Sequence, residues 1–392
     1  MTTVPAGELS PLWIDRAEDV EALTRSLRTS SLVALDTEAD SFHSYHHKLC
    51  LVQLSSGGTH ALLDPLRLGV NGLAPLAEVL ADRDRLKILH GADYDLRILD
   101  RDLGVRVRGL ADTHAAAQLL GERHTGLASL LERELGVHLS KELQRADWSV
   151  RPLSAAHRAY AAADTAFLEA LLERLLSRLR ALGRLAWWEE ECRALEEVRY
   201  EPSPPDPFAF ERLKGAKALR GAARDRLAAL HAWREGVAAA ADVAPYKVMG
   251  RDTMLRLAQE APADMAALAA TAGVGRATVR RHGLALLQLL REPPPAPQRE
   301  RLPRPAVDRE FEARLKVARA RRDERARILD LEPGVLAPRE RLEEVVRALP
   351  AHEDALAECL GRRWRAAALA ADLLPLTTEW RATLTSSDAC PA

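Results

Sequence analysis

Cysteine and long apolar runs are both scarce in this sequence. Its 392 residues include 4 cysteines, and no two of them form a Cys-x-x-Cys pair. That scatter argues against a zinc site or a disulfide framework and indicates reduced thiols in the cytoplasm. Because no apolar run reaches the roughly 18 residues that suggest a membrane helix, no membrane span is expected. The N-terminal residues also lack the basic and apolar stretches of a signal peptide.

Net charge is almost absent, but its distribution is uneven. The formal net charge is -1, yet residues 211–291 hold 14 Lys and Arg against 7 Asp and Glu, a local charge of +7. The rest of the chain is therefore acidic on balance. A basic segment of this kind is typical of a phosphate-binding surface, and the acidic remainder includes carboxylates that could bind a metal ion.

The first third of the chain alternates strand and helix patterns. Apolar runs predict strands at 31–35, 48–54, 60–63 and 86–89, with a hairpin signal between the second and third. Amphipathic patterns predict helices at 94–102, 113–121 and 125–135, and a long helix at 155–181. This order predicts an α/β fold: a mixed sheet with an antiparallel meander and flanking helices.

From about residue 206 the pattern becomes wholly helical, so an all-α region follows. Proline clusters at 202–207 and 293–297 separate the segments. Residues 245–262 align without gaps on 333–350, an offset of 88, which favours a duplicated helical module over chance similarity between two Ala/Leu/Arg-rich segments. The predicted domains are therefore 1–205, 206–292 and 306–380.

Asp36 and Glu38 stand at the end of the first apolar strand. Residues two apart in an extended chain share one face, so both carboxylates can reach one site. Oxygen ligands of this kind suit hard divalent cations such as Mg²⁺. Alone, however, an Asp-x-Glu pair is more often a solvated strand end.

Three further residues are candidates for the same site. Tyr160 and Asp164 are one helical turn apart, so a phenol could orient or deprotonate a water beside the carboxylate. A half-buried tyrosine with an exposed aspartate is the plainer interpretation. Asp95 begins a predicted helix after the strand at 86–89, and we assign Asp93 to the helix cap and Asp95 to the site.

Taken in order, these motifs resemble the DEDD superfamily of 3′→5′ exonucleases, in the subgroup with tyrosine in its third motif. The stretches at 141–149, 151–154 and 160–164 strongly resemble the ribonuclease D family. The segment around Pro245, Tyr246, Arg251 and Asp252 is similar to the helical HRDC domain, and this family carries two such domains. The likeness is weakest after residue 305.

The resemblance implies a ribonuclease-H-like exonuclease domain followed by two HRDC-like domains. It also implies a metal-dependent 3′→5′ exoribonuclease that releases nucleoside 5′-monophosphates. Asp36, Glu38, Asp95 and Asp164 would hold two divalent ions, Mg²⁺ or Mn²⁺, while Tyr160 positions the attacking water. The expected partner is RNA with a single-stranded 3′ end, tRNA precursors being the family's usual substrate. The protein is expected to be a cytoplasmic monomer.

Nucleic-acid contacts are expected on two parts of the chain. Phe42 or Tyr45 could stack on a base in the loop after the first motif. His43, His46 and His47 crowd that loop, but a solvated loop is favoured over zinc. In the basic segment, merely solvated charges are the alternative for each of the phosphate-binding candidates, Arg220, Arg224, Lys247, Arg251, Arg276, Arg280 and Arg281. Structural roles are expected for His90 and for Asp112 as a helix cap. Trp148 is expected to pack a loop under the site, with stacking on the substrate as the open alternative.

Two other functions remain open from the sequence. A DNA exonuclease of the same superfamily would share all five site residues, since nothing in the sequence tests for a 2′-hydroxyl. A nucleic-acid-binding scaffold without turnover would be expected to have lost an acidic ligand, and none is missing.

Overall fold

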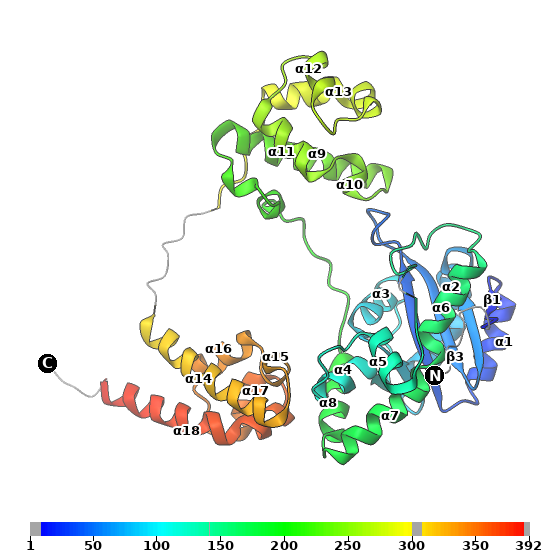
Figure 1. Ribbon diagram of the computed structural model, residues 1–392, viewed down its shortest axis with the longest axis vertical. Coiled ribbons are helices and arrows are strands. Elements are labelled where there is room, and N and C mark those ends of the chain that lie inside the picture. The colour runs from blue at the N-terminus through cyan, green and yellow to red at the C-terminus, as the bar shows by residue number, and fades with distance from the viewer. Residues whose placement is uncertain (1–8, 141, 300–307, 388–392) are drawn as a thin grey trace.

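The structure is a computed structural model that describes residues 9–140, 142–299 and 308–387 (Figure 1). Within these residues, six strands form one mixed sheet in the order β1-β4-β3-β2-β5-β6. The strands are β1 (Leu12–Ile14), β2 (Leu32–Ala39), β3 (Leu49–Ser56), β4 (Thr59–Leu63), β5 (Leu86–Leu89) and β6 (Leu110–Asp112). β2, β3 and β4 are an antiparallel meander, while β5 pairs parallel to β2 and β6 parallel to β5. The predicted mixed sheet with a meander is confirmed.

Helices cover both faces of this sheet, which explains why β3 is an almost continuous apolar run and nearly fully buried. One core lies under α1 (Ala17–Leu27), α2 (Pro65–Ala81) and α3 (Asp93–Leu103). The other lies under α4 (Thr113–Leu119), α5 (Leu127–Leu135), α7 (Leu168–Ala181) and α8 (Leu185–Leu195). α6 (Ala155–Ala166), which carries Tyr160 and Asp164, lies in front of β3.

Two local predictions in this region were wrong. The helix expected over 155–181 is two helices, because the backbone leaves helical geometry at Phe167, between α6 and α7. Asp93 does not cap α3: the residue in the cap position is Ala92, without a side-chain hydrogen bond. Asp93 instead forms an ion pair with Arg97 one turn later.

The duplication predicted at an offset of 88 is visible in the backbone. The first helical module contains α9 (Gly221–Ala241), α10 (Pro245–Val248), α11 (Arg251–Glu260), α12 (Met265–Ala270) and α13 (Arg276–Arg291). The second contains α14 (Arg309–Leu329), α15 (Pro333–Leu336), α16 (Arg339–Ala348), α17 (Glu353–Leu360) and α18 (Arg363–Ser387). Even the non-glycine residues with left-handed backbone match: Asp242 with Asp330, and Ala261 with Leu349.

The two modules are attached to the α/β domain in different ways. The first has a separate hydrophobic core and meets the domain through polar contacts. The second shares one continuous core with α4, α5, α7 and α8. Its Trp364 stacks on Trp187 of α8 with ring centroids 4.8 Å apart, and Glu190 accepts hydrogen bonds from the first two amides of α18.

Two observations bear on where the helical modules end. α18 continues past residue 380 to Ser387. Ala296 is buried in the core of the first module, and its amide donates to Asp225, so this module extends beyond 292. Among the described residues, no helix is both long and apolar enough to cross a membrane.

Candidate active site

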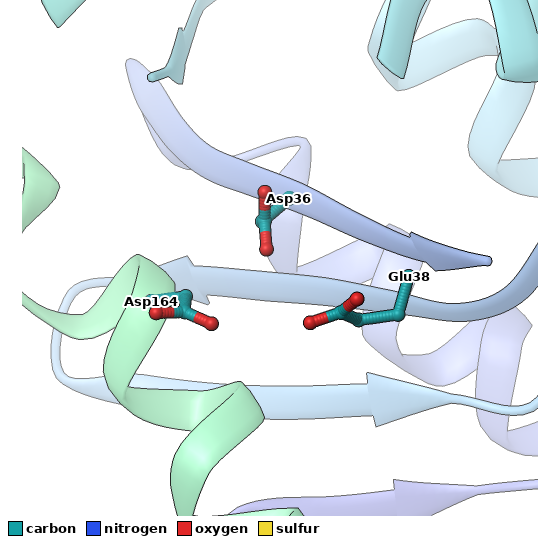
Figure 2. Close-up of side chains that lie close together, drawn as sticks. All are labelled: Asp36, Glu38 and Asp164. Atoms are coloured by element: carbon teal, nitrogen blue, oxygen red, sulfur yellow. The ribbon is translucent and has the colours of Figure 1, made fainter. Parts of the chain in front are cut away.

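Three carboxylates from two distant parts of the chain converge on one point. Asp36 and Glu38 project from the same face of β2, and Asp164 projects toward them from α6 (Figure 2). One oxygen of each lies within 4.8 Å of the others. Three hard oxygen donors this close together match the ligand preference of divalent cations such as Mg²⁺.

The electrostatics of this cluster also favour a cation. Burial and the nearby Asp164 raise the pKa of Asp36 to about 8, and burial and Asp36 raise the pKa of Glu38 to about 10. Burial raises the pKa of Asp164 to about 7. Without a cation the site therefore retains protons at neutral pH, and a bound divalent ion would offset the repulsion between the three charges.

Asp95 lies beside this cluster but is not part of it. It is buried in the first turn of α3, and its carboxylate accepts a hydrogen bond from the hydroxyl of Thr37. Burial and the charge of Asp36 raise its pKa well above the ordinary value. Asp95, the fourth predicted metal ligand, therefore lies close to the site, and its carboxylate is held by Thr37, the residue next to Asp36.

Gln53 is a site residue that the sequence analysis missed. It is fully buried on β3 directly opposite Asp36, and its amide nitrogen donates to the Asp36 carboxylate at 3.3 Å. Its amide oxygen is buried without a hydrogen-bond partner among the described residues. The available signal was one amide inside the otherwise apolar strand Leu-Cys-Leu-Val-Gln-Leu.

Asp112 caps a helix, as predicted, and also fixes the turn that leads to Asp95. Its carboxylate accepts from the amides of His114 and Ala115 at the start of α4. It also accepts from the amides of Gly91 and Ala92, just before α3. His90 bonds to Thr113 in the same corner, which agrees with its expected structural role.

Tyr160 lines two cavities beside α6. A cavity of about 690 Å³ is lined by Tyr160, Asp164 and residues 138–140, 142 and 143, among others, and a smaller one of about 180 Å³ shares Tyr160 and Asp164. The tyrosine packs against the buried Trp148, with ring centroids 6.0 Å apart. Trp148 therefore supports the site from below, as predicted.

The loop after Glu38 connects the site to the first helical module. Asp242 accepts hydrogen bonds from the His46 amide and the Lys48 ammonium, and Lys247 donates to the His43 carbonyl. His43, His46 and His47 form no metal-binding group in the described residues. Phe42 is 53% exposed on this loop, and Tyr45 is half-buried against His46.

The basic candidates of the first module fall into two groups. Arg224 and Arg220 are committed to structural bonds, with Glu211 and with backbone carbonyls respectively. The others have exposed side chains: Lys247, Arg251, Arg276, Arg280 and Arg281. Within this second group, Lys247 also donates to the His43 carbonyl and Arg251 pairs with Asp252, so Arg276, Arg280 and Arg281 are the candidates most available for phosphate.

Comparison with known proteins matches two segments of the chain to known families. Residues 11–180 match the 3'-5' exonuclease family, and residues 223–290 match the HRDC domain. The ribonuclease D of Gluconacetobacter diazotrophicus is 35% identical over 276 residues, which cover 70% of this chain and 69% of that protein. The ribonuclease D of Xanthomonas oryzae pv. oryzae is 32% identical over 370 residues, covering 93% and 98%.

The chain belongs to the ribonuclease D family. It is a 3′→5′ exoribonuclease, and the predicted fold class is confirmed. The crystal structure of Escherichia coli RNase D, an exoribonuclease involved in structured RNA processing, is similar over 95% of this chain and 100% of that chain, with a TM-score of 0.64 and 27% identity. Exonucleases of the DEDD superfamily use divalent metals, and the carboxylate cluster of this ribonuclease D relative fits that requirement.

Proposed function

We propose that this exoribonuclease trims structured RNAs, tRNA precursors among them, from a single-stranded 3′ end and releases nucleoside 5′-monophosphates. The observation that carries the proposal is the convergence of Asp36, Glu38 and Asp164 beside the open cavities at Tyr160. The relatives named ribonuclease D, and the structured-RNA role of the Escherichia coli enzyme, support RNA as the substrate class.

Two divalent ions, Mg²⁺ or Mn²⁺, are the proposed cofactors. Asp36, Glu38 and Asp164 would hold them directly, and Asp95, beside the cluster, is the fourth proposed ligand. When bound, the ions supply Lewis acidity for the attack of water on phosphorus and for the departure of the 3′-oxygen.

Tyr160 is proposed to orient the attacking water. Burial and the charge of Asp164 raise the pKa of its phenol, so the hydroxyl keeps its proton at neutral pH. A neutral phenol donates one hydrogen bond and accepts another, which suits orientation better than proton removal. Asp164, one turn later on α6, shares the same cavity wall.

The domain organisation and setting are part of the same proposal. We divide the chain into an exonuclease domain at 1–205 and two HRDC-like domains that begin at 206 and 306, with ends moved to 297 and 387. A monomer is proposed because one chain supplies all five site residues. The buried or half-buried free thiols Cys50, Cys192 and Cys359 support a reducing compartment such as the cytoplasm.

The test is digestion of a 5′-labelled single-stranded RNA with a free 3′-hydroxyl, in Mg²⁺ and in EDTA. The expected result is a metal-dependent ladder that shortens from the 3′ end, absent with Asp164→Ala and slower on DNA of the same sequence. A tRNA precursor with a short 3′ tail should be trimmed back to the duplex. Faster cleavage of DNA, or binding without product, would overturn the proposal.

A further inference from the structure

We propose that a groove along α6, leading away from Tyr160, binds the RNA segment 5′ of the scissile bond, with Arg158 and Arg67 contacting its phosphates and Trp13 stacking on a base. The inference rests on the proposed function, because it extends the substrate path of the same site. It assigns a role to residues of β1, α2 and α6 that neither the motifs nor the metal cluster involve.

The first part of the groove is the larger cavity at the active site. Its volume of about 690 Å³ lies within the roughly 300–1,000 Å³ of pockets that enclose whole small ligands, so nucleotide units have room in it. One wall is a row of small side chains on α6, Ala156, Ala159 and Ala163. These methyl groups cannot read base edges, which suits an enzyme that must accept any sequence.

A second cavity continues the first around the start of α6. It has a volume of about 410 Å³ and is lined by Trp13, Asp15, Asp64, Arg67, Arg151, Pro152, Leu153 and Arg158. Arg158 lines both cavities, so they adjoin. The chain at β1 lines both: Pro11, just before the strand, lines the first and Trp13 lines the second.

The two outer arginines of this groove are free to bind an anion. Arg151 is fully committed, because its guanidinium bonds Asp64 at 2.7 and 2.8 Å and the carbonyls of Cys50 and Trp148. In contrast, the side chains of Arg158 and Arg67 form no hydrogen bond or ion pair within the described part of the chain, although both backbone amides are bonded. An RNA phosphate offers oxygens that a guanidinium can bind in a bidentate manner.

Trp13 gives the groove an aromatic platform. Its half-buried ring lines the second cavity, and the Arg151 guanidinium lies 5.5 Å from the ring centroid, which fixes its position. Stacking on such a ring accepts every base, as a non-specific single-strand site requires. Asp15 brings one negative charge to the same cavity, so it should weaken RNA binding rather than support it.

The geometry predicts a dependence on RNA length. α6 rises about 1.5 Å per residue, so its start lies roughly 14 Å from Asp164 along the helix axis. A dinucleotide bound at the metal site is too short to reach Arg67 and Trp13, whereas an octanucleotide can fill the whole groove. The enzyme should therefore gain kcat/KM as RNA lengthens.

The test compares kcat/KM for an unstructured octanucleotide with kcat/KM for a dinucleotide. We expect this ratio to fall about ten-fold in the double variant Arg67→Ala/Arg158→Ala, and about five-fold or more in Trp13→Ala through lost stacking. Arg174→Ala is the matched control, because Arg174 is an exposed arginine on α7 outside both cavities. Asp15→Asn should raise the ratio.

Binding provides a second readout that is independent of turnover. With a labelled octanucleotide in EDTA, the slope of log Kd against log salt should fall by about one for each phosphate-contacting arginine removed. If the kcat/KM ratio and the salt slope were unchanged in the arginine variants, the proposed RNA-binding role of the groove would be wrong, while the proposed function would stand. Failure of the unaltered enzyme to shorten any RNA would instead overturn the proposed function.

Discussion

The hydroxyl of Thr37 donates a hydrogen bond to the carboxylate of Asp95, and this contact joins the first two acidic motifs. Thr37 stands between Asp36 and Glu38 on β2, so its side chain leaves the opposite face of the strand. Asp36 and Glu38 thus form part of the carboxylate cluster, while Thr37 between them holds Asp95, the fourth proposed ligand. Both Thr37 and Asp95 are buried, so this bond does not compete with water.

Replacing Thr37 by valine should weaken metal binding. Valine keeps the shape of threonine but leaves the buried Asp95 oxygen without its donor, and a hydrogen bond to a charged group contributes about 1.5–3 kcal/mol. We expect the affinity for Mn²⁺, measured by calorimetric titration, to fall about ten-fold. Thr37→Ser keeps the hydroxyl and is the matched control. Equal Mn²⁺ affinity in the two variants would show that the hydroxyl does not position Asp95 for metal.

Metal-free protein should lose stability as the pH rises through neutrality. The pKa of Asp36 is about 8 and that of Glu38 about 10 in the folded protein, whereas both ionise near 4 when unfolded. The folded state therefore holds protons that the unfolded state releases. The stability that these protons contribute is fully present below about pH 4. It is lost as the pH rises through the pKa values of the folded state. Thermal melts in EDTA should show Tm falling from about pH 5 to about pH 9.

Two further measurements show whether the carboxylate cluster causes the change of Tm with pH. The double variant Asp36→Asn/Glu38→Gln cannot ionise at these positions, so its Tm should change less with pH over the same range. Adding Mg²⁺ should raise the Tm of the unaltered protein most at high pH, where the carboxylates are charged. A Tm that rises with pH in EDTA, relative to the double variant, would contradict the raised pKa values.

The site acids could be predicted because their signal is local. Asp36 and Glu38 follow an apolar run with strand spacing, and Tyr160 and Asp164 have helical spacing. The sequence could not predict that Asp95 would be held by Thr37, or that Gln53 would lie opposite Asp36. Both contacts depend on pairing between residues far apart in the chain, which strand periodicity does not encode.

The fold shows the same division between local and long-range information. The meander and the 88-residue repeat follow from strand periodicity, turn residues and proline positions. The break at Phe167 was missed because residues on both sides are good helix formers and only backbone geometry separates α6 from α7. The different attachment of the two modules was not predictable either, since it depends on contacts between α8 and α18.

The second module should unfold together with the exonuclease domain. Trp364 is 4% exposed in the core that the two share, and replacing a buried aromatic side chain by alanine costs about 3–5 kcal/mol. Trp364→Ala should therefore lower the urea midpoint of the transition that reports on the sheet. Asp242→Ala removes polar contacts of the first module, one exposed and one partly buried, outside the shared core, and should change that midpoint little. Equal midpoints for both variants would contradict a shared cooperative core.

Removing the Tyr160 hydroxyl should slow the reaction without releasing metal. In Tyr160→Phe the ring still packs against Trp148, so α6 and Asp164 keep their positions. Positioned acid–base groups contribute about 10²–10⁴-fold in rate, and we expect kcat to fall by at least the lower figure. Single-turnover digestion of a labelled RNA measures this loss, and Mn²⁺ titration of the same variant should give an unchanged Kd. A rate within two-fold of the unaltered enzyme would exclude water orientation by Tyr160, and a weakened Kd would make the residue part of the metal site instead.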